Sequence, residues 1–215
     1  MEIGIMDNAK LRKFALSMVI GGVAGFAVAF TFMRVVDTGV IGDLEESRVI
    51  AALVGALYVM TATFVGIGLI NPQVGAKFLN VEDADELREQ MVVLRYSMVS
   101  IIALGAILIL LALAAPAGPL AEPVVACLIA LLLVITVFTT RKQMAHIDEL
   151  MASVSRETSA LAFYLVALIG GGWAAAAHLG FVGGPAMLDW ITLIATITLV
   201  ATFWVCGRRG LLTPR

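Results

Sequence analysis

The chain has 215 residues, of which 61% are hydrophobic and only 14% charged, with a mean hydropathy of +1.02 and a formal net charge of −2. Soluble domains carry about 25% charged residues, so this composition excludes an ordinary water-soluble domain and indicates a single domain embedded in a membrane. The chain has no basic block and is not expected to bind nucleic acid, and its two cysteines and two histidines are too few for a disulfide framework or a structural metal site.

Six long apolar segments follow one another along the chain. Each reaches or approaches the roughly 20 residues that a helix needs to cross about 30 Å of hydrocarbon. The segments cover residues 14–36, 49–70, 96–115, 123–140, 159–178 and 190–206. The first is longer than the apolar region of a cleaved signal peptide, which has about 7–15 residues, and is expected to be retained. The predicted fold is therefore an all-α polytopic membrane protein with six transmembrane helices arranged as three hairpins.

Prolines mark several of the expected helix ends. Pro72 ends the second segment and Pro116 the third, because proline cannot continue a helix, whereas Pro123 suits the first turn of the fourth. Neither proline nor glycine interrupts residues 85–103 or 148–168. The third and fifth spans are thus expected to extend as continuous helices into the connections that precede them.

Basic residues are distributed unequally between the two sides of the predicted membrane domain. With six spans, both tails lie on the same side as the connections 71–95 and 141–158, and this side carries every Lys and Arg except Arg34 and Arg48. The connections on the other side are short and acidic; they cover residues 37–47, 116–122 and 179–189. The positive-inside rule therefore predicts that both termini are cytoplasmic, and the small size and short loops favour a bacterial inner membrane.

The second and third hairpins, residues 80–142 and 145–209, share a weak similarity. Each contains an Asp-Glu-Leu sequence, which begins at Asp85 or Asp148, then a glycine- and proline-bearing outer turn and a final basic pair. An ancestral duplication would explain the similarity, since parallel repeats occur in membrane proteins. The same lipid rules shape any two hairpins of one orientation, so both explanations stay open.

Small residues recur at helical spacing on three spans. Such residues let helix backbones approach closely, and a polar side chain at the same seam can form a hydrogen bond across it. The candidates for helix packing are Gly21, Gly25, Gly55, Gly171, Ala175 and His178. A metal or haem ligand is the alternative role for His178, but His146 lies on the opposite predicted side, so a second ligand would have to come from another subunit. We expect no cofactor and no metal.

Hydroxyl groups on the second and sixth spans have two interpretations. Tyr58, Thr61 and Thr196 could together line a polar path through the membrane. Serine and threonine also bond back to the preceding turn of their own helix, and this second interpretation is favoured for the threonines.

No Asp, Glu, Lys, Arg or His lies near the middle of a predicted span, although ion-coupled transporters and proton relays generally place ionisable groups there. The chain also lacks a nucleophile elbow, an H-E-x-x-H motif and paired intramembrane carboxylates, so it is not expected to be an enzyme. The leading interpretation is an accessory, assembly or scaffold subunit that contacts lipid and either a membrane protein partner or further copies of itself. The alternatives are a small transporter or channel for a neutral or lipid-like solute and, more weakly, a membrane signalling sensor.

Overall fold

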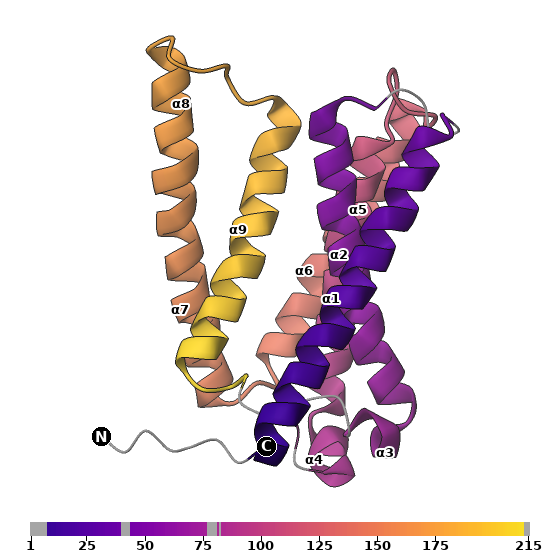
Figure 1. Ribbon diagram of the computed structural model, residues 1–215, viewed down its shortest axis with the longest axis vertical. Helices are drawn as coiled ribbons and strands as arrows, with labels where there is room; N and C mark the ends of the chain where they lie inside the picture. The colour runs from indigo at the N-terminus through magenta and orange to yellow at the C-terminus, as the bar shows by residue number, and fades with distance from the viewer. Residues whose placement is uncertain (1–7, 40–43, 77–80, 82, 213–215) are drawn as a thin grey trace.

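Residues 8–39, 44–76, 81 and 83–212 are described by the computed structural model, with side chains at residue 19 and from residue 21 onward (Figure 1). Within these ranges the chain is helical and contains no β-strand. The helices are α1 (Asn8–Asp37), α2 (Glu46–Ile70), α3 (Pro72–Gly75), α4 (Ala84–Glu89), α5 (Met91–Ala112), α6 (Glu122–Met144), α7 (Glu149–Leu165), the π-helix η1 (Val166–Gly170), α8 (Gly171–His178) and α9 (Met187–Arg208).

Five helical stretches of the described chain are long and apolar enough to cross a membrane. They are α2, α5, α6, the rod formed by α7, η1 and α8, and α9. These stretches coincide with the second to sixth predicted spans, so the all-helical fold is confirmed and an integral membrane protein is indicated. The first predicted span falls on α1, a helix of 30 residues that is not among the five. The sixth crossing therefore stays a prediction.

The expected extension of the fifth span is confirmed. Asp148 precedes α7 and accepts a hydrogen bond of 2.7 Å from the backbone N–H of Met151, which satisfies one of the free donors at the helix start. From Glu149 the chain is helical through η1 to His178. The expected extension of the third span is interrupted, because α4 ends at a cap, Gln90, and α5 begins at Met91.

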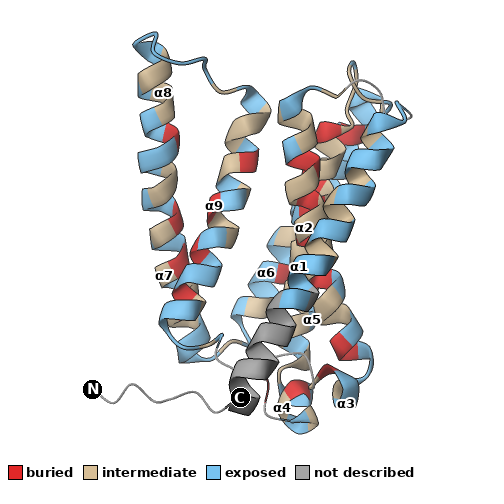
Figure 2. Ribbon diagram, viewed as in Figure 1, coloured by how far each residue is buried: buried red, intermediate tan, exposed pale blue. Residues whose placement is uncertain are grey.

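Helices α2 and α5 pack closely against each other, and buried residues follow both helices in Figure 2. Their backbones come nearest at Gly55 and Gly105. A Cβ atom on Gly55 would lie 2.6 Å from the carbonyl oxygen of Gly105, and the reciprocal distance is also 2.6 Å. Because real Cβ atoms do not approach oxygen this closely, glycine at both positions is what allows the two backbones to meet.

Helix α6 packs on α5 and is otherwise largely exposed. Only Val125 and Thr139 are buried among its residues. The Thr139 hydroxyl lies 2.6 Å from the hydroxyl of Ser100 on α5, and both side chains are buried. A polar pair of this kind is satisfied within the protein rather than left in hydrocarbon, so it helps to fix the position of α6 on α5.

Helices α7 and α9 form a second hairpin that closes at one end and opens toward α8 (Figure 1). The buried residues near the closed end are Val154, Thr158, Ala162, Ile197, Ala201 and Val205. By contrast, no residue of α8 is buried. The hairpin joins the α2–α5 pair through contacts between α2 and α9.

Candidate functional site

Of the three residues of the predicted polar path, Tyr58 lies at the contact between α2 and α9, whereas Thr196 on α9 is exposed. Tyr58 is buried on α2, and its hydroxyl donates a hydrogen bond of 2.8 Å to the backbone carbonyl of Ala195 in the middle of α9. A hydroxyl that is committed to a carbonyl inside the protein ties two helices together. Tyr58 therefore holds the two helices together at this contact.

The two threonines of the predicted path bond to their own helices. The Thr61 hydroxyl donates to the carbonyl of Leu57 at 2.8 Å, and the Thr196 hydroxyl donates to the carbonyl of Thr192, also at 2.8 Å. This is the back-bonding that hydroxyl side chains favour in apolar surroundings. The hydroxyls of Tyr58, Thr61 and Thr196 are thus all bonded to backbone carbonyls, and none is left to line a polar channel.

Of the residues predicted to pack helices together, Gly55 is covered by another described helix, and Gly21, Gly25, Gly171, Ala175 and His178 are not. Gly55 meets α5, as described above. Cβ atoms placed at Gly21 and Gly25 on α1 and at Gly171 on α8 would have no described atom within 4 Å. Ala175 and His178 are exposed on the same face of α8 as Gly171. This uncovered face, made of Gly171, Ala175 and His178, is called the α8 small-residue face below.

Several glycines with close contacts were not among the predicted packing residues, Gly105 and Gly170 among them. Gly105 faces Gly55, and at Gly170 a Cβ atom would lie 2.6 Å from the indole ring of Trp190 on α9. The residues three and four positions from Gly105 are all isoleucine or leucine, whereas Gly170 lies in a run rich in glycine and alanine. Only the pairing of helices in space reveals which glycines are covered.

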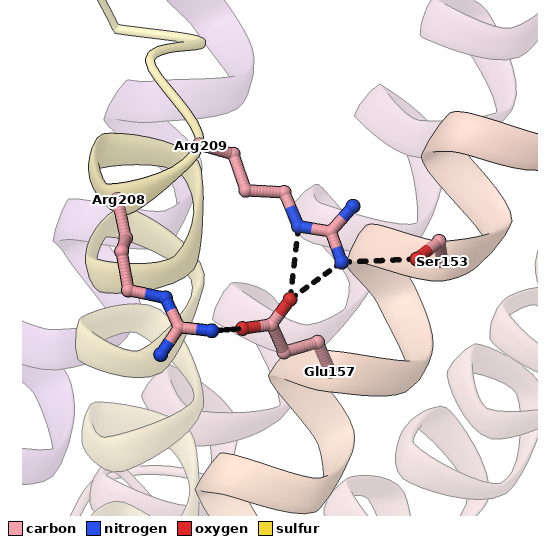
Figure 3. Close-up of polar contacts among 4 residues, drawn as sticks. All are labelled: Ser153, Glu157, Arg208 and Arg209. Atoms are coloured by element: carbon pink, nitrogen blue, oxygen red, sulfur yellow. Dashed lines mark hydrogen bonds and ion pairs between the residues drawn. The ribbon is translucent and has the colours of Figure 1, made fainter.

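Ionised side chains join α7 to the end of α9 (Figure 3). The Glu157 carboxylate lies between Arg208 and Arg209; it pairs with Arg208 and accepts hydrogen bonds of 2.9 and 2.6 Å from Arg209 Nε and Nη2. The same Nη2 atom donates to the Ser153 hydroxyl at 3.0 Å. Two cations near the last turn of α9 also suit the negative end of that helix dipole.

A pocket of about 380 Å³ lies at the other end of the bundle, where α2 and α9 begin and α5 ends. Its volume is within the range of small-molecule sites, which starts at about 300 Å³. The lining is mainly apolar, with one acid, one hydroxyl and one guanidinium. It consists of Glu45, Ser47, Arg48, Leu111, Ala114, Ala186, Met187, Leu188 and Ile191.

Arg48 holds two helix ends together at this pocket. Its Nη1 atom donates to the carbonyl oxygens of Ala112 at 3.0 Å and Ala114 at 2.7 Å, which lie at the end of α5. The Ala112 carbonyl belongs to the last turn of α5, where carbonyls lack partners within the helix, and the Ala114 carbonyl also accepts a hydrogen bond of 3.0 Å from the backbone N–H of Gly118. A cation beside this helix end also favours the helix dipole. The only signal in the sequence was that Arg48 stands among acidic residues on the sparsely basic side.

Asp189 fastens the start of α9 beside the same pocket. One of its carboxylate oxygens accepts a hydrogen bond of 2.7 Å from the backbone N–H of Ala186, and the other accepts one from the Ser47 hydroxyl of α2. The carboxylate therefore caps α9 and links it to α2. Together with Tyr58, this contact sets the distance between the two hairpins.

In the part of the chain that the structure describes, no three His, Cys, Asp or Glu side chains gather as a metal-binding group. The polar groups described above instead form helix-to-helix contacts and line the pocket beside Arg48. Comparison with protein-family models, with curated proteins and with solved structures finds no match for this chain.

Proposed function

We propose that the protein is a non-enzymatic accessory or scaffold subunit of a membrane assembly, and that its partner is another membrane protein or a second copy of this chain. One observation carries the proposal: the α8 small-residue face is uncovered, although residues of the same size are covered by a neighbouring helix at Gly55 and Gly105. Small residues favour helix association because they let backbones approach closely. A helix from outside the described chain fits this face.

The proposal includes a membrane topology. We take α1 as a sixth span, which gives both termini the same side, and the predominance of Lys and Arg on that side supports a cytoplasmic location in a bacterial inner membrane. Fusions of a periplasm-active and a cytoplasm-active reporter after Arg209 and within residues 141–148 test this topology. Both sites are expected to report the cytoplasm, and periplasmic activity at either one would overturn the orientation.

Transport of a neutral or lipid-like solute is the second candidate, and the pocket beside Arg48 is the observation that favours it. The contact between α2 and α9 argues against a continuous path, because the hydroxyls of Tyr58, Thr61 and Thr196 are all bonded to backbone carbonyls. A water-soluble thiol reagent applied to cysteines introduced at residues 61 and 196 separates the candidates. Protection of both cysteines is expected for a scaffold, and labelling of both would support transport.

Site-specific crosslinking in native membranes tests the scaffold function. A photoreactive amino acid at position 175 is expected to give a discrete crosslinked product, and the additional substitution Gly171→Leu is expected to abolish it because the bulkier side chain keeps another helix away. The matched control is position 134 on α6, because Val134 is exposed on a helix that contains no glycine. Two epitope tags on co-expressed copies distinguish a second copy from a different protein.

Equal crosslinking at positions 134 and 175 would contradict the proposal, since it would indicate random collision in the bilayer. So would a product at position 175 that persists after Gly171→Leu. If no crosslinked product forms at position 175 and the protein purifies as a homogeneous single chain in mild detergent, the scaffold proposal would also be contradicted.

A further inference from the structure

We propose that the pocket beside Arg48 binds a zwitterionic phospholipid, with the phosphate toward Arg48, the amine toward Glu45 and the start of an acyl chain between α5 and α9. The proposal does not depend on the scaffold function. It rests on where the pocket lies, on the two opposite charges in its wall and on its apolar side.

The position of the pocket is that of a membrane–water boundary. Three apolar helices change to connecting segments around it, because α2 begins at Glu46, α9 begins at Met187 and α5 ends at Ala112. A ligand at this level is wetted on one side and surrounded by apolar groups on the other. Such a position suits an amphiphile better than a wholly polar or wholly apolar molecule.

The wall of the pocket contains two opposite charges that are not paired with each other. Glu45 and Arg48 both line it, yet no ion pair joins them, and neither forms an ion pair with any other described residue. Arg48 uses Nη1 for the two α5 carbonyls, and its Nε and Nη2 atoms form no hydrogen bond within the described ranges. Guanidinium donors of this kind bind phosphate oxygens well.

The balance of charge selects the class of lipid. Among the described residues of the wall, Arg48 is the only basic one, whereas Glu45 is acidic. The Asp189 carboxylate accepts a hydrogen bond from Ser47, which also lines the pocket. A headgroup that carries only negative charge would be repelled by two carboxylates and attracted by one guanidinium at this pocket. A phosphate that carries its own cationic amine matches both signs, because the amine can face Glu45 while the phosphate faces Arg48.

The remaining wall accepts a hydrocarbon chain. Leu111 on α5 and Leu188 and Ile191 on α9 supply its apolar side. These side chains can pack against the methylene groups of an acyl chain that remains in apolar surroundings. The volume of about 380 Å³ holds a headgroup and the first part of a chain, with the rest of the chain left in the bilayer.

The experiment is native mass spectrometry of the full chain in detergent, titrated with phosphatidylethanolamine, with phosphatidylglycerol of identical acyl chains and with chain-free glycerophosphoethanolamine. The wild type is expected to bind phosphatidylethanolamine about fivefold more tightly than phosphatidylglycerol, which is the effect of one ion pair near the surface. Glu45→Gln is expected to remove this preference. Glu46→Gln is the matched control, because Glu46 is adjacent and exposed but does not line the pocket.

Arg48→Gln is expected to weaken binding of both phospholipids, and Arg34→Gln, which changes a basic residue on α1 away from the pocket, is its control. Because Arg48 also caps α5, the Glu45 variant remains decisive even if Arg48→Gln fails to fold. Equal binding of the two phospholipids by the wild type, or equal effects of Glu45→Gln and Glu46→Gln, would overturn the proposal. Glycerophosphoethanolamine binding as tightly as the intact lipid would overturn a lipid as the occupant.

Discussion

The α2–α5 pair and the α7–α9 hairpin are built from similar apolar helices but are held together differently. The α2–α5 pair is packed along its length, and its backbones meet at Gly55 and Gly105. The hairpin is fastened near one end by buried side chains and by Glu157, while α8 at its other end buries no residue. A small residue therefore contributes to packing only where another helix covers it. The small residues Gly171 and Ala175 on α8 are not covered by another described helix.

The most disruptive test of this contrast is Gly105→Ala. The new methyl group would collide with the carbonyl oxygen of Gly55, so we expect the free energy of unfolding to fall by about 1–3 kcal/mol, as for other overpacked sites. Denaturant titration in mixed micelles measures the change. Gly171→Ala is the control, because no described atom lies within 4 Å of the place its methyl group would occupy and alanine favours helix. Equal losses in both variants would contradict the contrast.

The closed end of the hairpin is tested by Glu157→Gln. Removing the charge between Arg208 and Arg209 is expected to lower the free energy of unfolding by about 1 kcal/mol, at the upper end for ion pairs near a surface. The same micelle titration at low salt provides the measurement, and high salt is expected to reduce the difference. Asp85→Asn is the comparison, since its pair with Arg88 is more exposed and local to one helix. A larger loss from Asp85→Asn would count against the assigned role of Glu157.

Tyr58→Phe tests the link between the two units. The substitution removes only the hydrogen bond to Ala195, and interhelical hydrogen bonds in membranes average about 0.6 kcal/mol. The distribution of distances between spin labels on α2 and α9 is expected to broaden, while the free energy of unfolding of the α2–α5 pair stays nearly unchanged. Thr61→Val, which removes a hydroxyl bonded within its own helix, should leave these distances as in the wild type. Identical distance distributions for both variants would show that the Tyr58 hydrogen bond does not help to hold the two units together.

Ser100→Ala is expected to have the smallest effect. It removes the hydroxyl that faces Thr139, but Thr139 keeps its bond of 2.8 Å to the carbonyl of Ile135, so no polar group is stranded. The expected loss is below about 0.6 kcal/mol in the same micelle titration. A loss as large as that of Gly105→Ala would mean that α6 is held mainly by this hydroxyl pair.

Hydropathy, together with the residues that begin or end helices, was enough to predict most of this fold. Lipid imposes a length and a polarity on each span, so the second to sixth segments could be located without knowing their neighbours. The pairing of spans could not be predicted in this way. Gly105 has the same local surroundings in sequence as many lipid-facing residues, and only α2 makes it a contact site.

The candidate site was predicted only in part for the same reason. Tyr58 and Gly55 were identified because a polar or small residue stands out in an apolar span. The positions of Arg48 and Asp189 depend on three helix ends that meet in space and are distant in the chain. Sequence spacing carries no information on such a meeting point.

The π-helical turn η1 changes the rotation of α8 relative to α7 within one continuous helical rod. Its hydrogen bonds join residues five apart instead of four, so it accommodates roughly one extra residue and turns everything beyond it by about 100°. This rotation places Gly170 on the same side of the rod as Ala162, against α9, where an uninterrupted α-helix would put the two residues about 80° apart. Deleting one of residues 166–169 would turn this stretch into ordinary α-helix and leave the α8 small-residue face where it is, because the rod would still place Gly170 against α9.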